Sequence, residues 1–184
     1  NLNIDCYSSF SFQEKKIKEI ANKSNGLVIS GGGNIFKIEK KKINLIRDKF
    51  EKKLLKEFLK RKKPILAICR GFQLIADFNK FKIYKIKNHV KKNHLIKIIK
   101  KNKFIKCNML KTNSFHNLAV RDLKKDFQIN GISIDGNIEI ATNLKKKCLC
   151  FMFHPERKNV SKKAIDQIII NFFHGSNYTS SRSR

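Results

Sequence analysis

One cysteine stands where a predicted strand turns into a predicted helix. Residues 64–68, PILAI, form a short apolar run typical of a buried strand, and residues 70–78 return to helical spacing. Cys69 lies between them, with Ala67 and Gly71 as the small neighbours that a strained strand-to-helix turn needs. Its side chain would project above the carboxyl edge of the sheet, where open α/β sheets bind ligands. This stretch alone supports a nucleophilic cysteine and a small buried apolar residue equally well.

The setting of Cys69 would also activate a thiol. The N-terminus of the following helix directs partial positive charge at the sulfur, which lowers the pKa of a thiol. Arg70 adds to that field. We therefore expect the pKa of the Cys69 thiol to lie below its ordinary value.

A base for such a thiol occurs late in the chain, in the segment FMFHPER. His154 comes directly after an apolar strand-like run, residues 148–153, and Glu156 stands two residues later, beyond Pro155. A nucleophilic thiol needs a base, and the base needs a carboxylate that holds its ring and stabilises the imidazolium. One short, proline-stiffened loop can supply both groups. A histidine and a glutamate at this spacing are also common on surfaces by chance.

A glycine run near the front of the chain could stabilise an oxyanion. Residues 31–33 are all glycine and follow the apolar segment 26–30, GLVIS. Thioester chemistry passes through an oxyanion that needs preorganised N–H donors, and glycine lets the backbone approach closely. No Gly-Lys-Ser/Thr follows, which excludes a phosphate-binding loop of that type. An ordinary glycine turn is the alternative interpretation.

The remaining pattern predicts helices around these motifs and further strands. We expect a helix over 12–23 that starts at a capping box of Ser11 and Glu14, and an amphipathic helix over 41–62. A last helix should run from a cap at Ser161 to His174 and stop at Gly175. Short alternating segments after residue 80 predict additional, partly antiparallel strands at 81–86, 94–99, 104–110, 127–134 and 137–142.

Length and composition bound the class of protein. The chain has 184 residues, enough for one α/β domain, which we place at 1–175 with a disordered polar tail at 176–184. No run approaches the roughly 18 apolar residues of a membrane-spanning helix, and no signal-peptide pattern is visible. The five cysteines are an odd number, so reduced thiols in a cytoplasmic protein are expected.

The formal charge of +28, from 42 basic and 14 acidic residues, has two explanations. One is nucleic-acid binding through phosphate neutralisation. The other is an A+T-rich genome, because lysine, isoleucine and asparagine codons can be written with A and T alone. The lysines are scattered through every predicted element rather than gathered in one tail, which favours the second. A basic surface would still attract an anionic, phosphate-bearing substrate.

In this order and spacing, the three motifs resemble the class I glutamine amidotransferase-like family over nearly the whole chain. The family's G-x-C-x-G-x-Q elbow appears as residues 67–73, AICRGFQ, with Ala67 in place of the usual glycine. Alanine is the next smallest residue, so the elbow should survive. The resemblance implies a three-layer, flavodoxin-like α/β fold whose mostly parallel central sheet is flanked by helices and has additional antiparallel strands. Family members begin with a strand and a helix before the equivalent of residues 2–6, so both are expected to be missing here.

Within the family, several segments are similar to the γ-glutamyl hydrolase branch, which includes γ-glutamyl-γ-aminobutyrate hydrolase. The arrangement looks most like the bacterial γ-glutamyl-CDP-amidate hydrolases, which serve phosphoramidate decoration of capsular polysaccharide. The resemblance thus implies a small-molecule γ-glutamyl substrate, and neither a metal nor an organic cofactor. The segments are CRGFQ (69–73), RDKFE (47–51), NSFHN (113–117) and DGNIE (135–139).

The resemblance also implies a role for each site residue. Cys69 would be the nucleophile, His154 the base and then the acid, and Glu156 the orienting carboxylate. The oxyanion hole would be formed by the amides of Gly32 or Gly33 and of Arg70, and the substrate would be held by Gln73, Asn113, Ser114, Phe115 and His116.

Other titratable residues have simpler interpretations. We expect His116 in the substrate pocket, His94 in a structural role, His89 exposed, and His174 at a helix C-terminus. A zinc site at Cys148 and Cys150, which share one strand face, is disfavoured because no second ligand pair has metal spacing. The segment RDKFE is either a solvated, salt-bridged helix face or a structural element at the edge of the pocket.

Three other functions stay open. The domain could be the glutaminase subunit of an amidotransferase that supplies ammonia to a synthase partner. It could hydrolyse γ-glutamyl-γ-aminobutyrate instead. Nucleic-acid binding ranks last, because the chain lacks the aromatic–basic pattern of RNA-recognition modules and any zinc-finger spacing. No membrane partner is expected.

Overall fold

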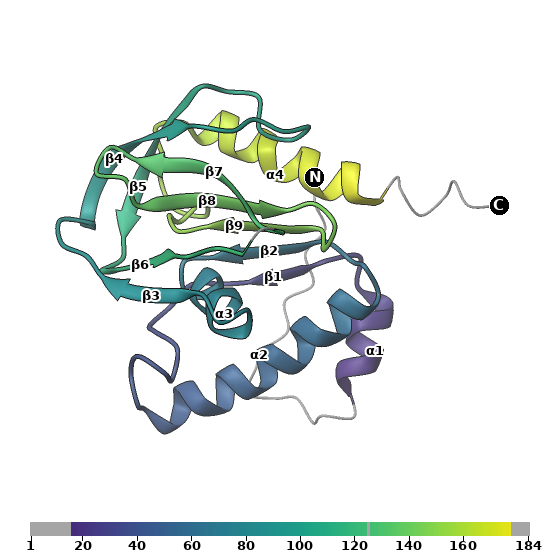
Figure 1. The fold of residues 1–184 in the computed structure, drawn as a ribbon. Helices are drawn as coiled ribbons and strands as arrows, with labels where there is room; N and C mark the ends of the chain where they lie inside the picture. The colour runs from purple at the N-terminus through teal and green to yellow at the C-terminus, as the bar shows by residue number, and fades with distance from the viewer. Residues whose placement is uncertain (1–15, 125, 178–184) are drawn as a thin grey trace.

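The fold is built around a curled seven-stranded sheet with helices on both faces (Figure 1). The computed structural model describes residues 16–124 and 126–177. The strands follow the order β1-β2-β9-β8-β7-β4-β5, and β3 and β6 form a separate two-stranded sheet. The helices are α1 (Lys16–Lys23), α2 (Lys42–Lys60), α3 (Arg70–Phe78) and α4 (Lys162–Asn177). The strands are β1 (Leu27–Ile29), β2 (Ile65–Ile68), β3 (Lys82–Lys85), β4 (Val90–Ile98), β5 (Met109–Phe115), β6 (Leu118–Arg121), β7 (Gln128–Ser133), β8 (Ile138–Asn143) and β9 (Cys148–Phe151).

Three neighbouring strands, β1, β2 and β9, run parallel. Parallel strands need a crossover, and α2 supplies it between β1 and β2. In the register of these strands, Ala67 pairs with Ile29 on one side and with Cys150 on the other. The carboxyl ends of the three strands therefore meet at one edge of the sheet, the place where such sheets bind ligands.

The other part of the sheet is antiparallel. β9 pairs with β8, β8 with β7, β7 with β4, and β4 with β5, all in antiparallel register. Short connections, such as the four-residue stretches between β7 and β8 and between β8 and β9, permit only this direction. The α/β class, the flanking helices and the added antiparallel strands are confirmed. Among the described strands, however, the parallel arrangement is limited to β1, β2 and β9.

Burial on both faces explains why β2 is apolar throughout. Ile65 and Ala67 pack with α1, α2 and α3 on one face, whereas Leu66 and Ile68 pack with α4 on the other. Figure 1 shows the same three layers, with α4 alone on one side of the sheet. A strand covered on both faces has no polar side to present, so it lacks alternation.

Some predicted boundaries were wrong. The run 104–110 is largely not a strand: Phe104 and Ile105 are buried against α4, and Oδ1 of Asn102 accepts their backbone N–H groups. β6, which we did not predict, follows soon after β5. α4 continues past Gly175 because that glycine is not left-handed; instead, a β-carbon there would lie 2.9 Å from the Phe104 ring.

Several expectations fall wholly or partly outside the described residues. They are the Ser11–Glu14 cap, the first part of the helix predicted over 12–23, and the tail from 178 onward. Among the described helices, none combines the length and apolar character needed to cross a membrane. The single domain at 1–175 and the cytoplasmic location stay predictions.

Candidate active site

Cys69 lies at the turn from β2 to α3 in a strained backbone conformation. Its φ is +49°, in the region that residues with a side chain rarely adopt. Its backbone N–H donates to the carbonyl oxygen of Phe151 on β9 at 2.7 Å. A β-carbon at Gly71 would lie 2.2 Å from the carbonyl oxygen of Ile29, so only glycine allows α3 to start this close to β1. The predicted elbow is present, and Ala67 fits within it at 0% exposure.

The thiol of Cys69 is less acidic than we predicted. Burial raises its pKa to about 11, although a hydrogen bond from the backbone N–H of Arg70 acts in the opposite direction. The negative charges of Glu156 and Glu139 raise the pKa further. Only 6% of the residue is exposed, so the cost of removing a thiolate from water exceeds the helix N-terminal effect.

The positive charge of Arg70 is directed away from the thiol. Its guanidinium group is fully buried and forms ion pairs with Asp48 and Glu51 of α2. Asp48 also accepts the backbone N–H of Phe36 at 2.8 Å. The segment RDKFE is therefore a buried structural element rather than a solvated face. Its function is to hold α2 against α3 and the loop after β1.

His154 and Glu156 form the predicted pair on the turn after β9. Nδ1 of His154 lies 2.6 Å from Oε1 of Glu156. Burial raises the pKa of Glu156, but the hydrogen bond from His154 and the charges of His154 and Arg157 outweigh it, so the pKa lies below its ordinary value. The carboxylate is therefore ionised at neutral pH and can orient the ring.

Two asparagines hold the backbone of His154. Oδ1 of Asn113 accepts the N–H of His154 at 3.0 Å, and Nδ2 of Asn113 donates to the carbonyl oxygen of His154 at 2.7 Å. Asn159 donates to the same carbonyl at 2.9 Å. We expected Asn113 to bind substrate, but its amide is engaged here. The sequence did not single out Asn159, and its position after HPER is the only signal that could have.

The glycine loop lies against the histidine ring. A β-carbon at Gly31 would lie 2.6 Å from Cε1 of His154. Gly32 and Gly33 have φ values of +100° and +65°, which favour glycine. The guanidinium group of Arg47 donates to the carbonyl oxygens of Ser30, Gly31 and Gly32 at 3.0–3.3 Å. These three carbonyl groups therefore point toward α2, the helix that carries Arg47.

The three motifs therefore meet at the carboxyl edge of β1, β2 and β9. Cys69 follows β2, His154 and Glu156 follow β9, and the glycine loop follows β1. The negative charge of Glu156 lies close enough to Cys69 to raise the pKa of its thiol. The arrangement places a thiol, a base with its carboxylate and a glycine loop together, as cysteine-dependent acyl transfer requires.

The other expected substrate-binding residues line the same region but have partners of their own. The amide of Gln73 contacts Asn34 and the N–H of Ile35, which fixes the end of the glycine loop. Phe115 packs edge-on against His154, with ring centroids 6.1 Å apart. The hydroxyl of Ser114 donates to the carbonyl oxygen of His89 at 2.6 Å. His116 lies 3.4 Å from Glu139, a residue that the prediction did not include.

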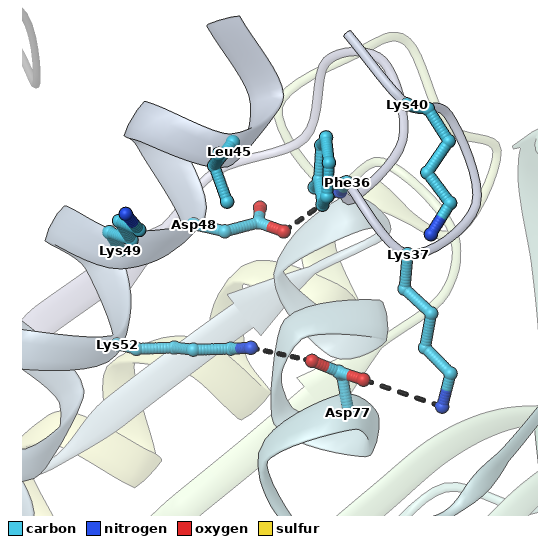
Figure 2. A pocket seen from close by; sticks show the side chains of 8 residues that line it. All are labelled: Phe36, Lys37, Lys40, Leu45, Asp48, Lys49, Lys52 and Asp77. Atoms are coloured by element: carbon cyan, nitrogen blue, oxygen red, sulfur yellow. Dashed lines mark hydrogen bonds and ion pairs between the residues drawn. The ribbon is translucent and has the colours of Figure 1, made fainter. Parts of the chain in front are cut away.

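A surface pocket of about 250 Å³ lies elsewhere, between α2, α3 and the loop after β1 (Figure 2). Figure 2 shows Lys37 and Lys52 on either side of Asp77, and Asp48 bonded to the backbone of Phe36. The Nζ atoms of Lys37 and Lys52 lie 3.5 and 2.6 Å from the carboxylate oxygens of Asp77. Neither Cys69 nor His154 lines this pocket. It is a lysine-rich pocket on the helical layer, separate from the candidate active site.

One family model and two relatives show what this chain is similar to in sequence. A family model described as Peptidase C26 matches residues 9–156, which include all three motifs. γ-Glutamyl-CDP-amidate hydrolase of Campylobacter jejuni is 31% identical over 82% of this chain and 68% of its own length. The carbamoyl phosphate synthase small chain of Buchnera aphidicola (Baizongia pistaciae) is 37% identical over 54% of this chain but only 25% of that protein.

Solved structures share the fold at low sequence identity. A glutamine amidotransferase from Thermotoga maritima matches with a TM-score of 0.64 and 21% identity, over 87% of this chain and 67% of that chain. A Thermoplasma acidophilum protein assigned as one chain of a GMP synthase matches with a TM-score of 0.72 and 20% identity, over 89% and 78% of the two chains.

Proposed function

The chain belongs to the Peptidase C26 family, of the class I glutamine amidotransferase-like proteins, and we propose that it hydrolyses γ-glutamyl amides through Cys69, His154 and Glu156. One observation carries the proposal. A cysteine with a strained backbone directly follows β2, and the neighbouring parallel strand β9 leads into a turn that holds a hydrogen-bonded histidine–carboxylate pair. A purely structural cysteine needs neither the strain nor the pair.

In the first step, Cys69 attacks the γ-carbonyl carbon of the substrate. His154 takes the thiol proton as the carbon–sulfur bond forms, because the thiol is neutral at physiological pH. The tetrahedral oxygen accepts hydrogen bonds from the amides of Gly32 or Gly33 and of Arg70. His154 then protonates the leaving nitrogen, the carbon–nitrogen bond breaks, and a γ-glutamyl thioester remains on Cys69.

In the second step, water replaces the amine. His154 takes a proton from the water as its oxygen attacks the thioester carbonyl, and the same oxyanion donors act again. The carbon–sulfur bond breaks, the thiolate of Cys69 recovers a proton from His154, and glutamate leaves. Glu156 stays ionised throughout and stabilises the imidazolium in each step. These groups need no cofactor for either step.

The first substrate to test is γ-glutamyl-CDP-amidate. The Campylobacter jejuni relative that bears this activity in its name covers most of the chain. Its substrate carries phosphate groups, and a chain with a formal charge of +28 favours anionic ligands. On this proposal the protein acts in the synthesis of capsular phosphoramidate. γ-Glutamyl-γ-aminobutyrate is the alternative substrate of the same reaction.

A glutaminase subunit is the second candidate function. Similarity to the small chain of carbamoyl phosphate synthase favours it, because that protein is one chain of a synthase. Such a subunit would act on glutamine and would depend on a synthase partner for full activity. A free-standing hydrolase would act alone on substituted γ-glutamyl amides.

The test is a substrate panel with the isolated chain. Glutamate release from γ-glutamyl-CDP-amidate, γ-glutamyl-γ-aminobutyrate and glutamine is measured, and intact mass spectrometry detects a γ-glutamyl adduct on Cys69. We expect Cys69→Ala to abolish both signals, while Cys107→Ala, in a partly exposed loop, keeps them. Turnover by Cys69→Ala would contradict the mechanism. Activity limited to glutamine would favour the glutaminase subunit.

A further inference from the structure

Three histidines and one glutamate come together beside the candidate active site. His89 immediately precedes β4, His94 lies within it, His116 follows β5, and Glu139 lies in β8. The ring of His89 lies 5.0 Å from the rings of both His94 and His116, measured between centroids. The Glu139 side chain is 0% exposed and that of His89 only 4%. His89, which we expected at the surface, is therefore part of a buried cluster.

The hydrogen bonds of the cluster fix which ring nitrogen carries the proton. Nδ1 of His116 lies 2.8 Å from the carbonyl oxygen of Leu118, so it must donate, and Nε2 of the neutral ring keeps its lone pair. Nε2 of His89 lies 2.8 Å from Asp135 and donates to it, which leaves the lone pair on Nδ1.

These lone pairs face the carboxylate of Glu139. Nε2 of His116 and Nδ1 of His89 lie 3.4 and 3.6 Å from Oε1 of Glu139, and Nε2 of His94 lies 3.7 Å from Oε2. These separations are too long for strong hydrogen bonds. Among the described residues, both carboxylate oxygens and Nε2 of His94 and His116 are buried without a hydrogen-bond partner. A buried carboxylate without a hydrogen-bond partner is costly, so a cation bound between these side chains would stabilise it.

The spacing fits a transition-metal ion. Ligand atoms of His89, His94 and Glu139 all lie within 4.8 Å of one another. At zinc–ligand bonds of about 2.0–2.1 Å, the ligand atoms of a tetrahedral site lie about 3.3 Å apart, so small side-chain shifts suffice. Imidazole nitrogens with a carboxylate suit zinc and neighbouring metals better than magnesium or calcium.

The surroundings of the cluster are those of a metal site. Metal-bound histidines usually donate their other N–H to a carboxylate or a backbone carbonyl, which orients the ring. His89 does so to Asp135, and His116 does so to Leu118. Asp135 is held in turn by the hydroxyl of Ser133 at 2.6 Å and the amide of Asn137 at 2.8 Å.

We propose that His89, His94 and Glu139, with His116 as the fourth ligand, bind a divalent metal ion of the zinc type. Four protein ligands would leave no open position, so the ion would be structural. It would tie β4 and the end of β5 to β8, and β7 lies between β8 and these two strands in the sheet order. The proposal does not depend on the hydrolase mechanism, because none of these four residues serves as nucleophile, base or orienting carboxylate there.

The first experiment is a titration of the chelator-treated chain with Zn²⁺, monitored by calorimetry, and with Co²⁺, monitored by visible absorption. We expect one equivalent per chain and the intense bands of tetrahedral Co²⁺, without thiolate-to-cobalt charge transfer. The absence of that transition distinguishes this site from Cys148 and Cys150, whose sulfur atoms lie 3.7 Å apart. Zn²⁺ should also raise the thermal midpoint, because it binds only the folded chain.

Variants decide whether these residues are the ligands. Glu139→Gln should weaken binding at least about 100-fold, and Asp135→Asn about 10- to 100-fold through the orientation of His89. His174→Ala, at an exposed position on α4, is the matched control and should bind normally. Circular dichroism checks folding, and if Glu139→Gln does not fold, His94→Gln decides, because that ring is partly exposed. Unchanged affinity in the ligand variants, or no saturable binding by the parent chain, would overturn the proposal.

Discussion

Nδ1 of His154 lies 2.6 Å from Oε1 of Glu156, and both residues lie on the turn that follows β9. The carboxylate accepts the Nδ1 proton, so Nε2 is the nitrogen left to exchange protons with a thiol or an amine. Only 6% of the His154 side chain is exposed, compared with 52% for Glu156. A partly hydrated carboxylate orients the ring but stabilises its charge less than a buried one would.

Glu156→Gln should therefore reduce turnover without abolishing it. We expect kcat for glutamate release to fall about 10- to 1,000-fold, because the amide can hold the ring but does not stabilise the imidazolium. KM should change little. Asp166→Asn, which removes an exposed ion-pair partner on α4, is the control and should leave kcat unchanged. Equal kcat values for Glu156→Gln and the parent chain would remove Glu156 from the mechanism.

The reactivity of Cys69 should depend steeply on pH. Burial raises the pKa of this thiol to about 11, so alkylation by iodoacetamide should become faster by about tenfold per pH unit between pH 6 and 9. Mass spectrometry of the labelled peptide measures it. A plateau near neutral pH would instead indicate a thiolate paired with a charged histidine.

The raised pKa of the Cys69 thiol also makes the stability of the fold depend on pH. A raised pKa means that the folded chain favours the neutral thiol. The stability that the neutral Cys69 thiol contributes is fully present below pH 9.0, the ordinary pKa of a thiol. It is lost as the pH rises through about 11, the pKa of Cys69 in the folded chain. Cys69→Ala should lack this part of the alkaline loss, as urea unfolding at several pH values would measure.

Gly71→Ala should destabilise the elbow. The new methyl group would lie 2.2 Å from the carbonyl oxygen of Ile29, a backbone atom of β1 that cannot move alone. We expect a loss of about 3 kcal/mol in the free energy of unfolding, from overpacking. Gly136→Ala is the comparison: its φ of +82° is strained, but no atom lies within 4 Å, so the loss should be about 1 kcal/mol. Equal losses in the free energy of unfolding for the two variants would mean that the close contact with Ile29 does not destabilise Gly71→Ala.

Arg70→Met should test the buried ion pairs. It leaves the buried Asp48 without Arg70 and leaves Glu51 with Arg47 alone, so the free energy of unfolding should fall by about 3–5 kcal/mol. The triple variant Arg70→Met, Asp48→Asn, Glu51→Gln should recover part of this loss. Lys162→Ala, which breaks an exposed pair, should cost less than about 1 kcal/mol. A small loss for Arg70→Met would show that the pairs are dispensable.

Local signals in the sequence were enough for the parallel strands and the elbow. The strands β1 and β2 are short apolar runs bounded by glycine or proline, and Gly71 meets a steric need that no other residue could. The antiparallel part was harder to place. Phe104 and Ile105 begin a short alternating segment in the sequence, yet they are buried as a loop under α4, and apolar residues in a short segment do not distinguish a strand from a packed loop.

Spacing in the sequence predicted one part of the candidate site, the family resemblance brought Cys69, His154 and the glycine loop together, and neither predicted the contact of His89 with Glu139. His154 and Glu156 are two residues apart, so their pairing could be inferred from spacing. His89 and Glu139 come from segments 50 residues apart that the curled sheet brings together, and no spacing rule connects them. The pKa of Cys69 was wrong in direction because the prediction included the helix N-terminus but not the depth of burial.

The contact between Gly31 and the His154 ring has a consequence for any attempt to re-engineer the chain. Since even a single methyl group at position 31 would overlap the imidazole, saturation mutagenesis there should return glycine alone among active clones. Designers who wish to widen specificity would do better to leave this corner untouched and to vary residues whose side chains already face open space.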